Sequence, residues 1–164
     1  MGKARRWTAV LVATGALALV GAACSPAGGP GPPVGAQSCG PDATTNAIFA
    51  YTNNSRAQNG LAPLVWNGQL GCLATAWSQY LASTGGFYHR DLNAVITSPG
   101  YQGYHTLGEN ILKGPASMSA ADMHNAWMNS PDHRANILSP AYSSMGIGLA
   151  YANGEVLATE NFGG

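Results

Sequence analysis

The last twenty residues constrain the fold of this chain more than any other feature. Two apolar runs, Met145 to Tyr151 and Glu155 to Phe162, flank the dipeptide Asn153-Gly154. Asn-Gly is a favoured pair for a two-residue hairpin turn, because both positions of that turn need positive φ. The sequence therefore predicts an antiparallel β-hairpin near the end of the chain, and the rest of the fold must pack around it.

Three helices are predicted ahead of this hairpin. They run from Asp42 to about Gln58, along an apolar stripe from Leu70 to Leu81, and from Ser119 to Asn129. Asp42 and Ser119 are good N-caps, and the stripe has the spacing of three and four that one helix face requires. Ser130-Pro131 begins a further short helical turn, whereas residues 87–108 are expected to be irregular. Helices before and between strands favour an α+β domain with helices packed on a sheet.

The start of the chain is typical of a bacterial export signal. Three cationic side chains among the first six residues precede an apolar run from Trp7 to Val20, which is too short to span a bilayer comfortably. Small residues and Cys24 follow, in an order similar to the lipobox, where signal peptidase II cleaves before a cysteine that carries diacylglycerol. We expect residues 1–23 to be a lipoprotein-type signal peptide and Cys24 to be lipidated. Ordinary secretion without lipidation is the alternative.

The remaining chain is expected to form a tether and one domain. Residues 24–38 are rich in proline and glycine, a composition that gives a solvated tether rather than a core. Residues 39–164 have the length of a single domain. They carry four basic and seven acidic side chains, a net charge of about −3 with neutral histidines. Such a surface lacks a basic stripe that would neutralise phosphates, so we expect no nucleic-acid partner.

Two cysteines, Cys39 and Cys72, lie within the predicted domain. In an oxidising exported compartment an even pair favours a disulfide, which would stabilise the fold by about 3–4 kcal/mol on the chain-entropy model. A reactive thiol is the alternative, although neither cysteine has a nearby histidine in a recognisable motif.

Four blocks of sequence concentrate polar residues at apolar or glycine-rich junctions. They are Asn53 to Leu64 (N-x-x-R-x-x-x-G-L-x-x-L), Phe87 to Asp91 (F-Y-H-R-D), Leu107 to Leu112 (L-G-E-N-I-L) and Ala126 to Leu138 (A-W-M-N-S-P-D-H-R-A-N-I-L). In combination they resemble the bacterial branch of the cysteine-rich secretory protein, antigen 5 and pathogenesis-related 1 (CAP, or SCP-domain) superfamily. The resemblance covers roughly residues 47–163.

This resemblance implies a three-layer α-β-α sandwich with a small antiparallel sheet and a surface cleft. In many members two histidines and two glutamates line that cleft. His89, Glu109 and His133 match three of the four positions, whereas Ser130 stands where the second glutamate is usual.

The chemistry of His89, Glu109 and His133 leaves three interpretations open. Two imidazoles and a carboxylate suit a zinc-type divalent ion with an open fourth position. They also suit a general acid and base, or a buried hydrogen-bond network that holds loops onto helices. Arg134 and Asn136 are interpreted as loop-fixing hydrogen-bond partners, and His105 and His124 as solvated side chains.

Three functions follow from these interpretations. The first is an exported, lipid-anchored module of the cell envelope that binds a lipid, a wall component or a protein in the His/Glu-lined cleft. The second is a metal-dependent hydrolase acting on peptides or wall polymers, and the third is a structural surface protein without a small-molecule ligand. The expected location is the outer face of the cytoplasmic membrane or the cell envelope, with the lipid anchor as the membrane contact. Zinc or a similar divalent metal is the cofactor that would suit the site.

Overall fold

The computed structural model describes residues 39–164. The chain divides between Pro30 and Gly31 into two units, and all described residues belong to the second. The expected signal peptide, the expected lipidation site Cys24 and the expected tether lie outside the described residues. Within residues 39–164, no helix combines the length and the apolar character needed to cross a membrane.

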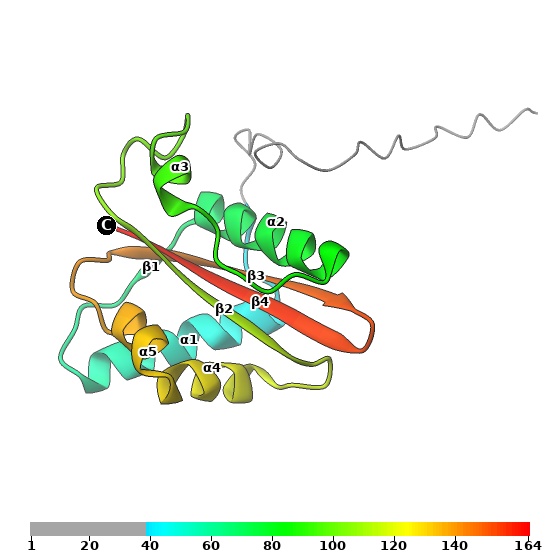
Figure 1. Cartoon of the computed structure of the whole chain (residues 1–164). Coiled ribbons are helices and arrows are strands. Elements are labelled where there is room, and N and C mark those ends of the chain that lie inside the picture. Colours follow the sequence, from blue (N-terminus) through cyan, green and yellow to red (C-terminus); the bar gives the residue numbers. More distant parts are fainter. Residues whose placement is uncertain (1–38) are drawn as a thin grey trace, which may run out of the picture. The chain divides into compact units, whose positions relative to one another are not determined.

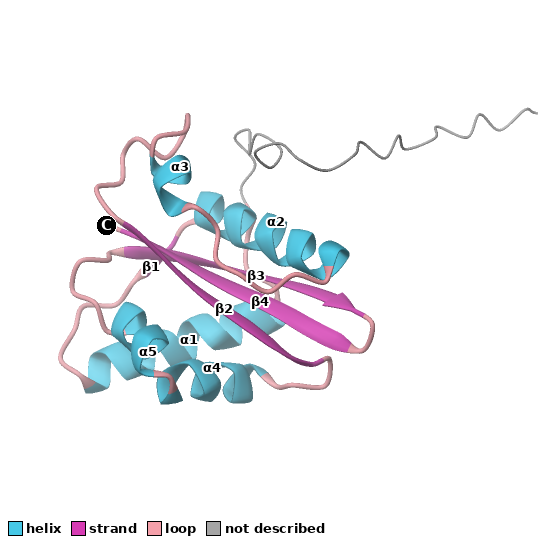
Figure 2. Cartoon of the chain, in the orientation of Figure 1, coloured by secondary structure: helices cyan, strands magenta, loops and turns pink. Residues whose placement is uncertain are grey.

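A four-stranded sheet lies between two layers of helices (Figures 1 and 2). The strands are β1 (Val65–Trp66), β2 (Leu107–Pro115), β3 (Ser144–Ala152) and β4 (Glu155–Gly163). Their order across the sheet is β1-β3-β4-β2, so β2 is an edge strand. Strands β2 and β3 are antiparallel to β4, and the short β1 runs parallel to β3.

The helices cover both faces of this sheet. They are α1 (Ala43–Gln58), α2 (Gly68–Thr84), α3 (Leu92–Ile96), α4 (Ala120–Asn129) and α5 (Pro131–Ile137). Figure 1 shows α2 and α3 on one side of the sheet and α1, α4 and α5 on the other. The predicted α+β, three-layer α-β-α sandwich is therefore confirmed, with the addition of one short parallel strand.

Local sequence signals place the helix ends as predicted. The N-cap Asp42 accepts a hydrogen bond from the Thr45 N–H at 2.8 Å, while the Thr45 hydroxyl accepts from the Asp42 N–H at 2.9 Å. Ser119 and Asp122 form the same reciprocal capping box ahead of α4. Gly85 ends α2 with φ of 70°, in the left-handed region that glycine adopts without strain.

The predicted hairpin is also present. Asn153 and Gly154 have φ of 52° and 78° and connect β3 to β4. Positive φ at both positions is the geometry of a type I′ turn, whose twist matches that of the flanking strands.

Two glycines of β3 set how closely α2 approaches the sheet. A Cβ atom at Gly146 would overlap the backbone of Leu70 and Gly71, and one at Gly148 would overlap the backbone of Ala74 and Thr75. Helix α2 therefore lies directly on the backbone of β3. On the opposite face, larger side chains form the main core.

The disulfide between Cys39 and Cys72 is present, with the two Cα atoms 5.0 Å apart. The Cys39 N–H donates to the Gly68 carbonyl at 3.1 Å, and the Trp66 indole N–H donates to the Cys39 carbonyl at 3.1 Å. The start of the domain is thereby fixed to the beginning of α2. The predicted pairing is confirmed, and the reactive-thiol alternative is excluded.

The expectation that residues 87–108 are irregular is wrong in two places. Helix α3 forms there because the Asp91 carboxylate accepts from the Asn93 and Ala94 N–H groups, at 3.0 and 3.2 Å. Strand β2 begins at Leu107 and continues to Pro115. Its Gly-Glu-Asn start has low strand propensity, and its stability depends on partners that are distant in sequence.

Candidate functional site

The edge strand β2 carries the first polar group of the candidate site. The side chain of Glu109 is 1% exposed, and its Oε1 accepts from the backbone N–H of Arg90 at 3.0 Å. The Nδ1 of His89 lies 3.0 Å from the same oxygen, while the His89 side chain is 56% exposed. Burial raises the pKa of Glu109, and the contacts with Arg90 and His89 oppose that shift. Two of the three predicted residues are thus in direct contact.

The loop that carries His89 is held against α2 by Arg90. The Arg90 guanidinium lies 4.7 Å from the centre of the Trp77 ring, a cation–π distance, and donates to the Leu73 carbonyl at 3.3 Å. These contacts fix the loop on which His89 approaches Glu109.

His133 reaches the same edge of the sheet from the other helical layer, on α5. Burial is the largest cause that lowers the pKa of His133; the charge of His89 lowers it further, and Asp132 opposes both. The Asn110 side chain, next to Glu109 on β2, donates to the His133 carbonyl at 3.1 Å. The fold brings all three predicted residues to one end of β2.

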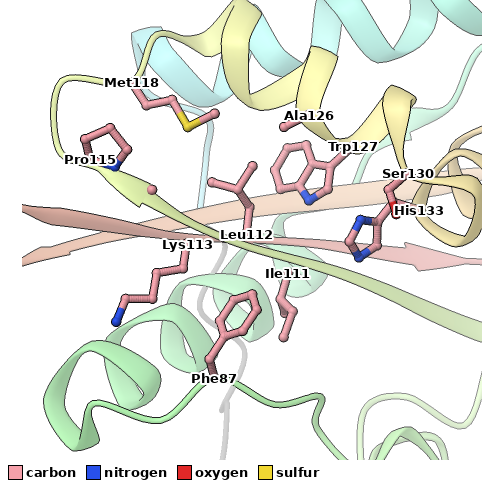
Figure 3. Close-up of a pocket in the computed structure, with 11 residues that line it drawn as sticks. Phe87, Ile111, Leu112, Lys113, Pro115, Met118, Ala126, Trp127, Ser130 and His133 are labelled. Carbon is pink, nitrogen blue, oxygen red and sulfur yellow. The ribbon is translucent and has the colours of Figure 1, made fainter.

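An apolar cavity of about 360 Å³ begins at His133 and follows β2 (Figure 3). Its lining residues are Phe87, Ile111, Leu112, Lys113, Gly114, Pro115, Met118, Ala126, Trp127, Ser130 and His133. We call this space the β2 groove. Figure 3 shows β2 crossing the view, with Trp127 and Met118 on one side and Phe87 on the other.

Ser130, at the position of the missing glutamate, lines the β2 groove beside His133. It is the N-cap of α5, yet its side chain makes no capping hydrogen bond. The position therefore offers the groove a hydroxyl group in place of a carboxylate, and the four-residue arrangement of many family members is incomplete here.

The geometry does not favour a metal centre at these residues. Within residues 39–164, no three or more His, Cys, Asp or Glu side chains are grouped so that they could hold a metal ion. The Nδ1 of His89 is engaged with Glu109, and His133 belongs to the opposite layer. The donor atoms present thus do not fit a three-ligand zinc site.

Behind the site lies a buried polar network that sequence reasoning missed. Glu160 on β4 is fully buried, and it accepts from the Asn110 side-chain amide at 3.0 Å and from the Thr52 hydroxyl at 3.3 Å. The same Asn110 amide donates to the His133 carbonyl at 3.1 Å. Asn136 donates to the Asn110 side-chain oxygen at 2.9 Å, which confirms its loop-fixing role. The network holds the α5 backbone against β2.

The expectation that His124 is solvated is wrong. The residue is buried, with Nε2 2.9 Å from the Ser55 hydroxyl and Nδ1 3.5 Å from the Thr52 hydroxyl. Burial lowers its pKa. His124 extends the Glu160 network toward α1. His105, in contrast, is exposed as predicted.

Comparison with known proteins agrees with this architecture. The family model described as the cysteine-rich secretory protein family matches residues 49–162. The protein YkwD of Bacillus subtilis (strain 168) is 34% identical over 120 residues, which cover 70% of this chain and 45% of that protein. The chain thus spans less than half the length of this relative.

Solved structures show the same fold. An extracellular protein of Bacillus anthracis str. Ames that contains an SCP domain matches with a TM-score of 0.63 and 26% identity, over 73% of this chain and 39% of that chain. An outer surface protein of Borrelia burgdorferi matches with a TM-score of 0.64 over 77% of this chain and 96% of that chain; at 16% identity it shows the fold alone. Together with the match to the family model, these findings show that the chain belongs to the cysteine-rich secretory protein family.

Proposed function

We propose that this protein is an exported, lipid-anchored module that binds an apolar ligand in the β2 groove, and that it is not an enzyme. The observation that carries the proposal is the groove itself, a cavity of about 360 Å³ lined mainly by apolar side chains and opening beside His133. A space of this volume, lined mainly by apolar residues with three polar side chains, Lys113, Ser130 and His133, lies in the size range of small-ligand sites.

Two lining side chains support binding over a purely structural role. Phe87 is 50% exposed at the groove, although a large aromatic side chain favours burial. Trp127 is 1% exposed, and its indole N–H has no partner among residues 39–164. A ligand in the groove would cover the first and offer the second an acceptor.

The hydrolase alternative is weaker because the groups at the end of the groove lack the required arrangement. His89 is hydrogen-bonded to a buried carboxylate rather than to a serine or cysteine nucleophile. Without such a nucleophile, hydrolysis would require a metal ion to activate water, and the residues that would bind the metal are not grouped here.

The binding proposal predicts a selective effect of filling the groove. Ala126 is an exposed residue of α4 that lines the groove, so Ala126→Arg should obstruct the space without removing any core atom. We expect hexadecanoate or a short apolar peptide to shift the NMR amide signals of residues 111–114 in the processed, unlipidated chain (Cys24→Ser). Ala126→Arg should weaken that binding by about tenfold or more, because the arginine side chain would take the place of apolar contact between the ligand and the groove.

Asn125→Arg is the matched control, because Asn125 is exposed on the same helix but does not line the groove. It should bind both probes like the unaltered protein. If neither probe shifts these amides, or if both arginine variants behave alike, the β2 groove is not the binding site.

The location is proposed from the sequence and from relatives. Cys24 follows a lipoprotein-type signal, and the similar Bacillus anthracis protein is described as extracellular. We expect the protein to sediment with membranes and Cys24→Ser to release it into the soluble fraction, as measured by fractionation and intact-mass analysis of the lipid. An unaltered protein that is soluble, with an unmodified cysteine, would contradict the anchor.

A further inference from the structure

We propose that the ligand of the β2 groove is an extended peptide segment, which adds to the sheet as a further strand along the open edge of β2. The inference rests on the proposed binding function, and it names the chemical class of the ligand. Peptide strands bind exposed sheet edges through main-chain hydrogen bonds, and alternate side chains give the specificity.

The hydrogen-bond pattern of the sheet shows which backbone groups of β2 face the groove. Thr106 and Gly164 exchange two backbone hydrogen bonds, at 3.1 and 3.2 Å, and the Ala116 N–H donates to the Gly154 carbonyl at 2.8 Å. Between these points the register with β4 is continuous from Leu107 to Pro115. Because hydrogen-bonded and non-hydrogen-bonded pairs alternate in an antiparallel ladder, the even-numbered residues of β2 bond to β4.

The odd-numbered residues therefore direct their backbone N–H and C=O groups away from β4. Ile111 and Lys113 are the odd-numbered residues that line the groove and still have an N–H. Within the described part of the chain, none of the turn, loop, cap or side-chain hydrogen bonds uses these backbone groups. The groove thus has an unpaired strand edge along one wall.

The stretch of β2 with unpaired backbone groups is limited at both ends, by Glu109 and by Pro115. The Glu109 carbonyl accepts from the Asn136 side chain at 3.3 Å, and Pro115 has no N–H to offer. Lysine and proline on an edge strand also oppose continuous sheet growth. The open length corresponds to about three to five residues of added strand at roughly 3.3 Å per residue.

The unpartnered indole of Trp127 favours a peptide over a hydrocarbon chain. Its Nε1 is buried without a hydrogen-bond partner, and Figure 3 shows this nitrogen directed toward β2. A peptide carbonyl in the groove could accept from it, whereas an acyl chain would leave a buried donor unpaired. The groove therefore has a main-chain ladder on one wall and a separate donor on another.

The lining also defines the character of the peptide. Side chains of an added strand would point alternately toward Phe87 on one side and toward Met118 and Trp127 on the other. The Nζ of Lys113, which lines the groove, is paired with Glu155 at 2.8 Å. Burial lowers the pKa of His133 and so disfavours its charged form. The lining therefore favours apolar, uncharged peptides.

The test uses a blocked pentapeptide of alternating valine and threonine, added at millimolar concentration to the processed Cys24→Ser chain. Two N-methylated versions carry the methyl groups on the odd or on the even backbone nitrogens. In a strand only every second N–H faces the partner edge, so one version should lose about tenfold in affinity while the other still binds. A groove that bound the peptide only through apolar contact would treat both versions alike.

The protein side of the test uses Lys113→Pro and Lys113→Ala. Both remove the same side chain, but only the proline removes the outward N–H, at an edge position where proline is tolerated. We expect Lys113→Pro to bind the peptide about tenfold more weakly than Lys113→Ala does, and the two variants to bind hexadecanoate with equal affinity. The NMR amide shifts of Ile111, Leu112 and Gly114, which keep an N–H in both variants, report each interaction.

The outcomes separate this inference from the proposed function. If hexadecanoate binds in the groove and the peptide does not, or if both methylated peptides bind equally, the strand-addition inference is wrong and the binding function stands. If neither probe binds, both are wrong. Peptide binding that depends on which nitrogens are methylated and on the Lys113 N–H would support both.

Discussion

Replacing Arg56 with methionine is expected to lower the free energy of unfolding by about 4 kcal/mol. Arg56 is 2% exposed, and its guanidinium donates to four backbone carbonyls. These acceptors are Ala62 at 2.9 Å, Ile137 at 2.8 Å, Ser139 at 2.9 Å and Tyr142 at 3.3 Å. Methionine fills much of the same space but leaves all four carbonyls without these donors, and each buried unpaired group costs about 1–3 kcal/mol.

Urea denaturation monitored by circular dichroism measures this effect. Arg134→Met is the matched control, because Arg134 is exposed and, contrary to the loop-fixing role expected from sequence, no side-chain hydrogen bond of it is present among residues 39–164. It should change the free energy of unfolding by no more than about 0.5 kcal/mol. Arg56→Lys should recover only part of the loss, since an ammonium group cannot reproduce the planar fork of the guanidinium. A loss of less than about 1 kcal/mol in Arg56→Met would show that the carbonyls find other donors.

Glu160→Gln is expected to stabilise the protein at alkaline pH and to have little effect in acid. Burial raises the pKa of Glu160 from its ordinary value of 4.5 to about 7, opposed by hydrogen bonds from Asn110 and Thr52. Below pH 4.5 the carboxyl group is protonated in both states. As the pH rises toward 7, the unfolded chain releases this proton while the native protein keeps it, so the free energy of unfolding falls. The full difference corresponds to about 3 kcal/mol.

A glutamine keeps the shape of the protonated side chain. Its oxygen can accept from Asn110, and its amide can donate to the Thr52 hydroxyl. His124 lies beyond Thr52 and is present in both proteins, so the difference between them isolates Glu160. Urea denaturation at about pH 5 and about pH 8 should show a gap between the proteins that grows by on the order of 3 kcal/mol.

Glu155→Gln is the corresponding control. Glu155 lies at the hairpin and pairs with Lys113 at 2.8 Å, with both side chains partly in solvent, so its removal should add no comparable pH dependence. If Glu160→Gln and the unaltered protein lose stability in parallel from pH 5 to pH 8, the carboxyl group is already ionised in the native state at pH 5.

The parts of the fold that sequence predicted are those with local signals. The Asp42 and Ser119 caps and the Asn153-Gly154 turn each depend on residues within a few positions of each other. Strand β2 has no such signal, because adjacent Glu109 and Asn110 are typical of a polar loop. In the fold both form hydrogen bonds with side chains far away in the sequence, Glu109 through its Oε1 with His89 and Asn110 with Glu160.

The burial of Glu160 could nevertheless have been predicted from the alternation of residues along β4. Val156, Ala158 and Phe162 alternate along β4 and belong to the main core, so Glu160 has the same parity as three buried residues. No pattern in the neighbouring sequence predicts that His124 is buried. Its partners, Thr52 and Ser55, precede it by about 70 residues on another helix, and only the packing of α1 against α4 brings them together.

The geometry of the candidate site could not be predicted from the sequence, and the function of its residues stays a prediction. The family resemblance placed His89, Glu109 and His133 together, and the fold brings them to one end of β2. The family resemblance could not predict the contact between the His89 Nδ1 and the buried Glu109 carboxylate. That contact depends on the Arg90 loop lying against α2. The unpaired edge of β2 was equally hidden, because it follows from strand order rather than from any residue in the strand.

The disulfide at the start of the domain has a mechanical consequence. Cys39 precedes α1, and its bond to Cys72 closes a covalent loop that contains α1 and β1. Tension applied upstream of Cys39 passes through the sulfur atoms directly into α2, the helix that packs on Gly146 and Gly148 of the sheet. Helix α1 and its Arg56 contacts carry none of this load. A pull on the upstream chain would therefore strain the α2–sheet interface first, and the α4–α5 side of the β2 groove would keep its shape.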